Sequence, residues 1–250
     1  MTVVIGVDGS ERSEPAIAFG GRLAAASGAH VVVACAFPAA QAYAPLRDAA
    51  LDTAVAATKR LEQVPARRVS IRAVPGSPAQ GLHEVAVAER ASLIVLGSTG
   101  TGRFGRLHRG STAEQLLQVA PCPVAVVPRR PGPVARIGVA YDDSPEARAA
   151  LASAKALARD FGAELELIAV AARDELEQQV RAAAGEHPLT VLRDGDPAAH
   201  LTARSGELDL LVTGSRGYQP LRAVLARGVS GRLIHRASCP VIVVPRTATA

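Results

Sequence analysis

The chain has 250 residues, of which 48% are hydrophobic and 3% aromatic, and its formal net charge is +5. This composition supports a folded core and excludes a chain that is disordered throughout, and the scarcity of aromatic rings disfavours proteins that stack nucleic-acid bases. The basic residues are spread along the chain without a block, so nucleic acid is not favoured as a partner. No apolar run approaches the length of a membrane span. Three cysteines without CxxC spacing disfavour a zinc site and a disulfide framework and fit the cytoplasm.

Short strands and helices alternate along the first half of the chain. The start of the chain is typical of a strand and a turn rather than of a signal peptide. Val- and Ile-rich apolar segments predict strands at residues 3–7, 30–36, 68–74, 92–96 and 123–127. Helices fill the gaps, for example at 14–27 and 78–90. This alternation predicts an open parallel sheet with right-handed crossovers, in which ligands bind beyond the carboxyl ends of the strands.

The second half of the chain repeats the first. VVIGVDGS at 3–10 is echoed by RIGVAYDDS at 136–144, and LIVLGSTG at 93–100 is echoed by LLVTGSRG at 210–217. Three further landmarks recur in the same order, and the second copy is shorter, mostly between its second and third strands. The connector PRRPGPVAR contains three prolines, which favour an extended and fairly stiff chain. We therefore predict two domains, at residues 1–130 and 134–250.

Polar residues follow the first strand of each copy. Ser10 and Ser144 each precede a predicted helix, so both are expected to be N-caps, and Pro145 suits the first helical position. Asp8 and Asp142 stand two residues earlier, at the strand ends. Such a carboxylate either only stabilises a turn or accepts hydrogen bonds from a ribose or an adenine amine, and both interpretations stay open.

The stretch GSTGTGRFGRLHRGST at 97–112 contains five glycines, with Arg103, Arg106 and Arg109 between them. Glycines let backbone N–H groups approach a ligand, and the helix that follows offers free N–H groups and a positive dipole end. The stretch is therefore either a phosphate site or a mobile loop whose hydroxyl group only caps the next helix. A Walker A motif is absent, and the first strand–helix turn lacks GxGxxG.

These motifs closely resemble the universal stress protein family, and the chain is similar to a tandem member with two such domains. Gly97, Gly100, Gly110 and Ser111 match the family's ATP-binding pattern G-x2-G-x9-G-[ST], and PCPVAVVP at 121–128 follows as in the family. The resemblance implies two tandem α/β Rossmann-like domains of the adenine-nucleotide α-hydrolase-like (HUP) class. Each would hold a five-stranded parallel sheet of order 3-2-1-4-5 with helices on both faces.

The resemblance also implies the residues that hold the nucleotide. In the first copy, adenine is expected near Gly6, Val7, Asp8 and Ala36, and ribose and phosphates are expected near Leu96, Gly97, Ser98, Gly100, Arg103, Gly110, Ser111 and Thr112. The corresponding residues of the second copy are Asp142, Val170, Thr213, Gly214, Ser215, Gly217, Arg227, Gly228 and Val229.

The second copy departs from the family pattern. Arg227 and Gly228 stand where the family has Gly and then Ser or Thr, and Asp143 replaces Gly9. An arginine could crowd the phosphates or pair with them, and Asp143 would repel them if it lay nearby. We expect the first copy to bind ATP and the second to bind it weakly or not at all.

The resemblance implies a cytoplasmic, ATP-binding regulator or sensor of stress, with Mg²⁺ as a conceivable companion of the nucleotide. No catalytic residue and no metal ligand set stands out, so at most slow ATP hydrolysis is expected. The alternatives are an adenine-nucleotide hydrolase-like enzyme and a nucleotide-free scaffold for protein partners. Family domains commonly pair through their last strands, so residues 124–127 and 241–244 are expected to pair within the chain. A homodimer and an unidentified protein partner stay open.

The cysteines are expected to be packing residues. Cys122 and Cys239 are repeat-equivalent, but antiparallel pairing of the last strands would hold them apart, so a redox pair is disfavoured. Cys35 falls in a predicted strand and is expected to be buried.

Overall fold

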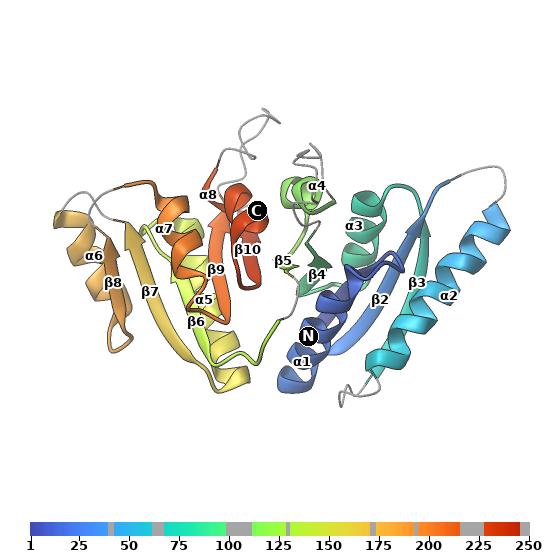
Figure 1. Ribbon diagram of the computed structural model, residues 1–250, viewed down its shortest axis with the longest axis horizontal. Coiled ribbons are helices and arrows are strands. Elements are labelled where there is room, and N and C mark those ends of the chain that lie inside the picture. The colour runs from blue at the N-terminus through green and yellow to red at the C-terminus, as the bar shows by residue number, and fades with distance from the viewer. Residues whose placement is uncertain are drawn as a thin grey trace. The chain divides into compact units, whose positions relative to one another are not determined.

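The computed structural model describes residues 1–39, 43–61, 68–98, 112–128, 131–170, 174–192, 195–215 and 228–245. The chain divides into two compact units, Met1–Pro131 and Gly132–Ala250, and the division falls inside the proline-rich connector (Figure 1). Among the described helices, none has both the length and the apolar run that crossing a bilayer requires.

The first unit alternates strands and helices as predicted. Its elements are β1 (Thr2–Val7), α1 (Ser13–Ser27), β2 (His30–Phe37), α2 (Tyr43–Leu61), β3 (Arg68–Pro75), α3 (Pro78–Ala88), β4 (Leu93–Gly97), α4 (Thr112–Val119) and β5 (Val124–Val127). The strands lie in the order β3-β2-β1-β4-β5, and each neighbouring pair is parallel. The predicted order 3-2-1-4-5 is therefore confirmed in this unit.

The second unit repeats this topology. Its elements are β6 (Arg136–Ala140), α5 (Pro145–Phe161), β7 (Glu164–Val170), α6 (Asp174–Ala184), β8 (Leu189–Leu192), α7 (Pro197–Arg204), β9 (Leu210–Ser215), α8 (Val229–Arg236) and β10 (Val241–Pro245). Its strands lie in the order β8-β7-β6-β9-β10, again with parallel neighbours. The first strand of each unit is therefore central in its sheet.

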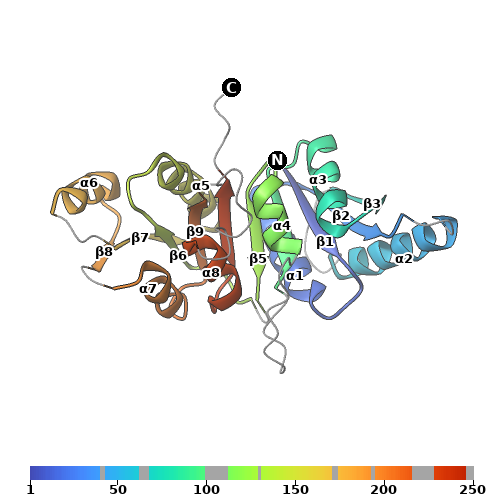
Figure 2. The same cartoon turned by 90° about the horizontal axis from the view of Figure 1, so that it is seen from above.

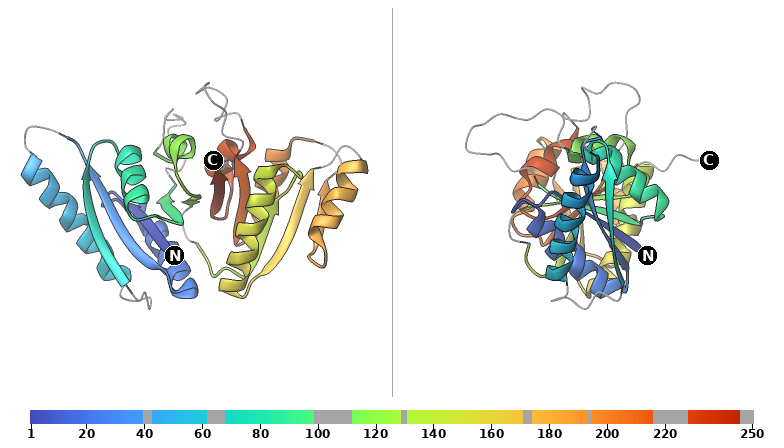
Figure 3. Two further views of the ribbon diagram at one scale, coloured as in Figure 1. Left: turned by 180° about the vertical axis from the view of Figure 1, so that it is seen from behind. Right: turned by 90° about the vertical axis from the view of Figure 1, so that its right-hand side faces the viewer.

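Helices cover both faces of each sheet, as Figures 2 and 3 show. In the first unit α1 and α2 lie on one face, and α3 and α4 lie on the other; α5 and α6 are separated from α7 and α8 in the same way. Strands that are covered on both sides have no solvent face, so consecutive residues can all be apolar. Val3, Val4 and Ile5 in β1 are accordingly all 0% exposed.

Two glycines let helices approach the central strand of the first unit. A Cβ at Gly20 in α1 would lie 2.6 Å from Cδ1 of Ile5, and a Cβ at Gly6 in β1 would lie 2.8 Å from Cδ1 of Leu82 in α3. Real Cβ atoms do not approach neighbours so closely, because packed interiors leave no free volume. Glycine at position 20 thus lets α1 pack closely on one face of β1, and glycine at position 6 lets α3 pack closely on the other face.

The capping prediction is confirmed for Ser144 and wrong for Ser10. Ser144 is the N-cap of α5, and its Oγ accepts a hydrogen bond from the N–H of Ala147 at 3.2 Å. Helix α1 begins later, at Ser13, with Arg12 at the N-cap position and no side-chain cap. Pro145 fixes the helical φ directly after Ser144, whereas Glu11 follows Ser10 and an extra turn forms before the helix.

All three cysteines are buried and free, as predicted. Burial raises the pKa of the Cys122 thiol to about 11 and that of Cys239 to about 12. Burial, together with the neighbouring Asp8 carboxylate, also raises the pKa of Cys35. Since the thiolate is the reactive form, these thiols are poor nucleophiles near neutral pH.

We expect no alkylation of the native protein by iodoacetamide at pH 8, and labelling of all three cysteines once the chain is unfolded in urea. Intact-mass spectrometry before and after unfolding measures this directly. Rapid labelling of Cys122 or Cys239 in the native protein would contradict it.

Candidate functional site

The carboxyl ends of three strands bring the predicted ligand residues of the first unit together. Strand β1 lies between β2 and β4, and the strand order reverses between β1 and β4, which is where open parallel sheets bind ligands. Val7 is paired with Cys35, and Ile5 is paired with Val95 two residues before Gly97. The turn after β1 and the end of β4 therefore lie at the same edge of the sheet.

Asp8 is exposed at this edge and is held by a compact hydrogen-bond network. Its Oδ1 accepts bonds from the N–H of Ser10 at 2.9 Å, from Oγ of Ser10 at 2.6 Å and from Oγ of Ser13 at 2.8 Å. Oγ of Ser13 accepts in turn from the N–H of Asp8 at 3.0 Å. Among the described residues, all three bonds to the carboxylate fall on Oδ1, so the side chain is oriented and these residues leave Oδ2 for another donor.

The same bonds set the protonation of Asp8. Partial burial by itself raises the pKa of this carboxyl, but the hydrogen bonds from Ser10 and Ser13 outweigh it and hold the pKa below its ordinary value. Asp8 is therefore an oriented anion near neutral pH.

Gly97, the first glycine of the loop motif, has a packing role. A Cβ at Gly97 would overlap the carbonyl oxygen of Arg12 and lie 2.8 Å from its carbonyl carbon. The repeat-equivalent Gly214 is restricted in the same way, because its Cβ would lie 2.7 Å from the carbonyl carbon and oxygen of Glu146. In each unit the backbone at the start of the first helix thus packs directly against this glycine. This packing role is independent of any contact that the glycine makes with a ligand.

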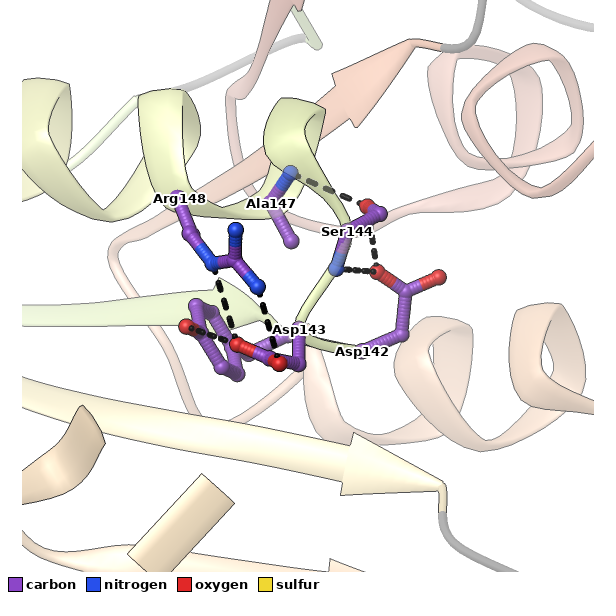
Figure 4. A network of polar contacts seen from close by, with 6 residues as sticks. Asp142, Asp143, Ser144, Ala147 and Arg148 are labelled. Atoms are coloured by element: carbon purple, nitrogen blue, oxygen red, sulfur yellow. Dashed lines mark hydrogen bonds and ion pairs between the residues drawn. The ribbon is translucent and has the colours of Figure 1, made fainter. Parts of the chain in front are cut away.

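The equivalent turn of the second unit uses different contacts (Figure 4). Oδ1 of Asp142 accepts from the N–H of Ser144 at 3.2 Å and from its Oγ at 2.6 Å. Asp143 has φ +60°, in place of Gly9 with φ +77°, so it occupies a conformation that disfavours side chains. Arg148 donates to both oxygens of Asp143, at 3.1 and 3.0 Å, and the hydroxyl of Tyr141 donates to Oδ1 at 3.0 Å.

These contacts bear on the expected repulsion by Asp143. The Arg148 guanidinium, with help from Tyr141, lowers the pKa of Asp143, while burial and the Asp143 carboxylate raise the pKa of Tyr141. In Figure 4 the Asp143 carboxylate points away from that of Asp142 and toward Arg148. The charge of Asp143 is therefore compensated on its own side of the turn, and its presence is no argument against an anion beside Asp142.

The remaining predicted residues have varied surroundings. Val7, Leu96, Thr213 and Ser215 are buried, and Oγ of Ser215 has no hydrogen-bond partner within the described ranges. Gly6, Ala36 and Val170 occupy strand positions, and Ser98 follows β4. Thr112 begins α4 and Val229 begins α8. Gly228 is the N-cap of α8 and makes no side-chain capping bond. Gly100, Arg103, Gly110, Ser111, Gly217 and Arg227 lie outside the described residues.

Sequence reasoning missed several contact residues. Ser13 holds Asp8 from the first turn of α1, and Arg148 and Tyr141 hold Asp143. The spacing D-x-S-x-x-S was a usable signal for Ser13, since a turn followed by a helix start brings its two serines to one carboxylate. No local pattern marks Tyr141 and Arg148, because their role depends on the left-handed backbone at position 143.

The fold is an α/β parallel sheet that occurs twice, and each unit has an aspartate-containing turn after its first strand and a glycine at the end of its fourth strand. A model of the universal stress protein family matches residues 1–128, 133–186 and 169–245. The chain therefore belongs to the universal stress protein family, and the repeated matches identify it as a tandem member.

The chain is similar to individual universal stress proteins and to solved structures. A universal stress protein of Thermus aquaticus is 32% identical over 136 residues, which cover 50% of this chain and 97% of that protein. The crystal structure of a universal stress protein from Archaeoglobus fulgidus has a TM-score of 0.79 at 22% identity, covers 98% of both chains and shares the fold. The structure of a universal stress protein in complex with cAMP is 28% identical, covers 51% of this chain and 96% of that chain, and has a TM-score of 0.46.

We expect Gly97→Ala to lower the free energy of unfolding by roughly 3 kcal/mol, the upper part of the usual range for overpacking, because the overlapped atom is backbone and cannot rotate away. Urea unfolding measures the loss. The control is Gly28→Ala, whose Cβ meets nothing within 4 Å and whose φ of +66° alone should cost about 1 kcal/mol. Equal losses in the two variants would refute the packing role of Gly97.

We expect the stability lost in Asp8→Asn to depend on pH. Because the folded-state pKa of Asp8 lies below its ordinary value, its carboxylate stabilises the fold at neutral pH, and this contribution disappears as pH falls through the folded pKa. Urea midpoints of wild type and variant should thus differ at pH 7 and converge as the pH falls below the ordinary range of a carboxyl group. Ser13→Ala should reduce the same pH dependence in part, and a constant difference between wild type and Asp8→Asn would contradict the account.

Proposed function

We propose that this protein binds an adenine nucleotide at the strand-end edge of its first unit and acts as a regulator or sensor of stress. The observation that carries the proposal is the Asp8 carboxylate, which is exposed, ionised and fixed through one oxygen at the point where the strand order reverses. An oriented carboxylate with a second oxygen available suits an adenine amine or a ribose hydroxyl, which are both donors.

The rest of the site follows from the motif. Adenine would lie near Gly6, Val7 and Ala36, and ribose and phosphates would lie along Leu96, Gly97, Ser98 and the first turn of α4 at Thr112. Gly100, Arg103, Gly110 and Ser111 complete the proposed phosphate end. Helix α4 begins at Thr112, and the positive end of its dipole would favour phosphate beside the motif.

A second, weaker site is proposed in the second unit. It comprises Asp142, Val170, Thr213, Gly214, Ser215, Gly217, Arg227, Gly228 and Val229. Asp142 keeps the serine contacts of Asp8. The N-cap of α8 is Gly228, which offers no hydroxyl at the position that Ser111 holds in the first copy. The adenine end is thus better retained than the phosphate end.

A binding and signalling role is favoured over catalysis. Within the described residues, the ionised carboxylate at the strand edge of the first unit is Asp8, whose proposed task is at the adenine end, away from a γ-phosphate. Slow hydrolysis of bound ATP, with Mg²⁺ in the complex, is the most that we propose.

Three buried free cysteines support a reducing compartment, so the cytoplasm is the proposed location. Pairing of the two last strands, a homodimer and an unidentified protein partner also remain proposals.

Calorimetric titration of the full chain with ATP, with and without Mg²⁺, tests the main site, and cAMP serves as a second adenine nucleotide. We expect ATP binding that Asp8→Ala weakens by about tenfold or more, because the oriented acceptor of the main site is lost. The control is Asp48→Ala, which removes an exposed carboxylate of α2 and should leave the affinity unchanged.

Absence of ATP binding by the wild-type chain would refute the proposal, as would equal affinity in wild type and Asp8→Ala. The alternatives are separated by two further measurements. Phosphate release at enzymatic rates would favour the hydrolase-like reading. Failure of every adenine nucleotide to bind, with none released from the purified protein on denaturation, would favour the scaffold.

A further inference from the structure

The two units differ in one side chain that can reach the aspartate after the first strand. Ser13, in the first turn of α1, donates from Oγ to Oδ1 of Asp8 at 2.8 Å and accepts from the N–H of Asp8 at 3.0 Å. Ser13 stands five residues after Asp8, and Ala147 stands five residues after Asp142. Because the two aspartates are repeat-equivalent, the second unit has a methyl group where the first has this hydroxyl.

The start of the first helix does not require the Ser13 hydroxyl. Helix α5 begins at Pro145 with Ser144 as its N-cap, and the N–H of Ala147 is bonded to Oγ of Ser144 at 3.2 Å. Alanine thus occupies the equivalent position in a helix that is capped without it. Ser13 is buried, and within the described residues both bonds of its Oγ are to Asp8. The hydroxyl of Ser13 is therefore best explained by its effect on Asp8.

The hydrogen bonds to the Asp8 carboxylate are unevenly divided between its two oxygens. Oδ1 accepts from Ser13 and from the N–H and Oγ of Ser10, whereas Oδ2 accepts from no described residue. Within the described part of the chain these donors are neutral, and no cation forms an ion pair with Asp8. Oδ2 is thus an anionic acceptor whose direction is fixed by bonds to the other oxygen.

The charge of Asp8 acts on the end of β2, where adenine is proposed to lie. Burial raises the pKa of the Cys35 thiol most, and the Asp8 carboxylate raises it further. Cys35 is paired with Val7 and directly precedes Ala36, and its Sγ donates to the carbonyl oxygen of Ala36. The Asp8 carboxylate therefore lies within electrostatic reach of the strand end that carries Ala36.

The ionised state of Asp8 decides which purine it can bond, because an ionised carboxylate only accepts hydrogen bonds. Adenine has an exocyclic amine, which donates, whereas hypoxanthine and guanine have an oxygen at the same ring position, which only accepts. Two acceptors form no hydrogen bond and repel each other, so a fixed carboxylate disfavours a purine with that oxygen.

We propose that Ser13 is a positioning residue that makes Asp8 select adenine over purines with an oxygen in place of the exocyclic amine. Together with Ser10, it holds Oδ1 and so keeps Oδ2 for the amine, and Ser13 itself does not touch the ligand. This inference rests on the proposed function, because it names the chemical group that Asp8 recognises in the proposed site.

The test titrates the full chain calorimetrically with ATP and with inosine triphosphate (ITP), which has an oxygen in place of the amine. Wild type should bind ATP about tenfold or more tightly than ITP, the equivalent of one hydrogen bond to a charged group. Ser13→Ala should weaken ATP binding about threefold or more and leave ITP binding unchanged. The control is Ser27→Ala, which removes a hydroxyl bonded to the Leu23 carbonyl at the other end of α1 and should change neither affinity.

Asp8→Asn gives a second readout, because the bonds on Oδ1 also orient an amide. The amide oxygen accepts those bonds, so the NH2 group takes the place of Oδ2 and donates. Asp8→Asn should therefore reverse the preference, with ITP bound more tightly than ATP. Adding Ser13→Ala should reduce this reversal, since one of the bonds that orient the amide is lost. A purely structural role of Ser13 would instead change both affinities equally in either background.

Urea unfolding at pH 7 verifies that each variant is folded, and Ser13→Cys, which keeps only a weak donor, replaces Ser13→Ala if that variant does not fold. Equal loss of ATP and ITP affinity on removal of the Ser13 hydroxyl would overturn the inference. Equal affinity of the wild type for ATP and ITP, or an unchanged preference for ATP in Asp8→Asn, would also overturn it. Failure of the wild type to bind either triphosphate would instead refute the proposed function itself.

Discussion

The contact on which both proposed ligand sites depend is that between the backbone at the start of the first helix and a glycine at the end of the fourth strand. Any side chain at Gly97 or Gly214 would collide with the carbonyl group of Arg12 or Glu146. This approach fixes how far the turn after the first strand stands from the end of the fourth strand. Because the acidic residue sits in that turn and the glycine motif starts at that strand end, one packing contact sets the spacing between the two parts of the proposed site.

The two units satisfy the geometry of this turn by different means. In both units the residue after the repeat-equivalent aspartate has a positive φ. Gly9 adopts this conformation without steric cost. Asp143 adopts it with a side chain, and the strain is offset by its pairing with Arg148 and its bond from Tyr141. The replacement that looks disruptive in the sequence is thus locally compensated.

The sequence was sufficient for the parts of the structure that depend on local pattern. Continuous apolar runs located the strands, since both sheet faces are covered, and the Ser-Pro pair at 144–145 located the start of α5. The N-cap prediction for Ser10 was wrong because the turn continues to Ser13, where α1 begins. Glu11 rather than proline follows Ser10, and Asp8 accepts hydrogen bonds from both serines, which stabilises the longer turn. The packing role of Gly97 could not be read locally, because the atom that excludes a side chain there belongs to a helix far away in the sequence.

The two units share some contacts of the proposed site and differ in others. Asp8 and Asp142 both accept bonds from the serine two residues on, although Asp8 also accepts one from Ser13 and Asp143 stands in place of Gly9. At the proposed phosphate end, the N-cap of α8 has lost its hydroxyl. Packing of the first helix requires the glycine contact at Gly214 but not the carboxylate of Asp142, so the retained aspartate favours the proposed second site.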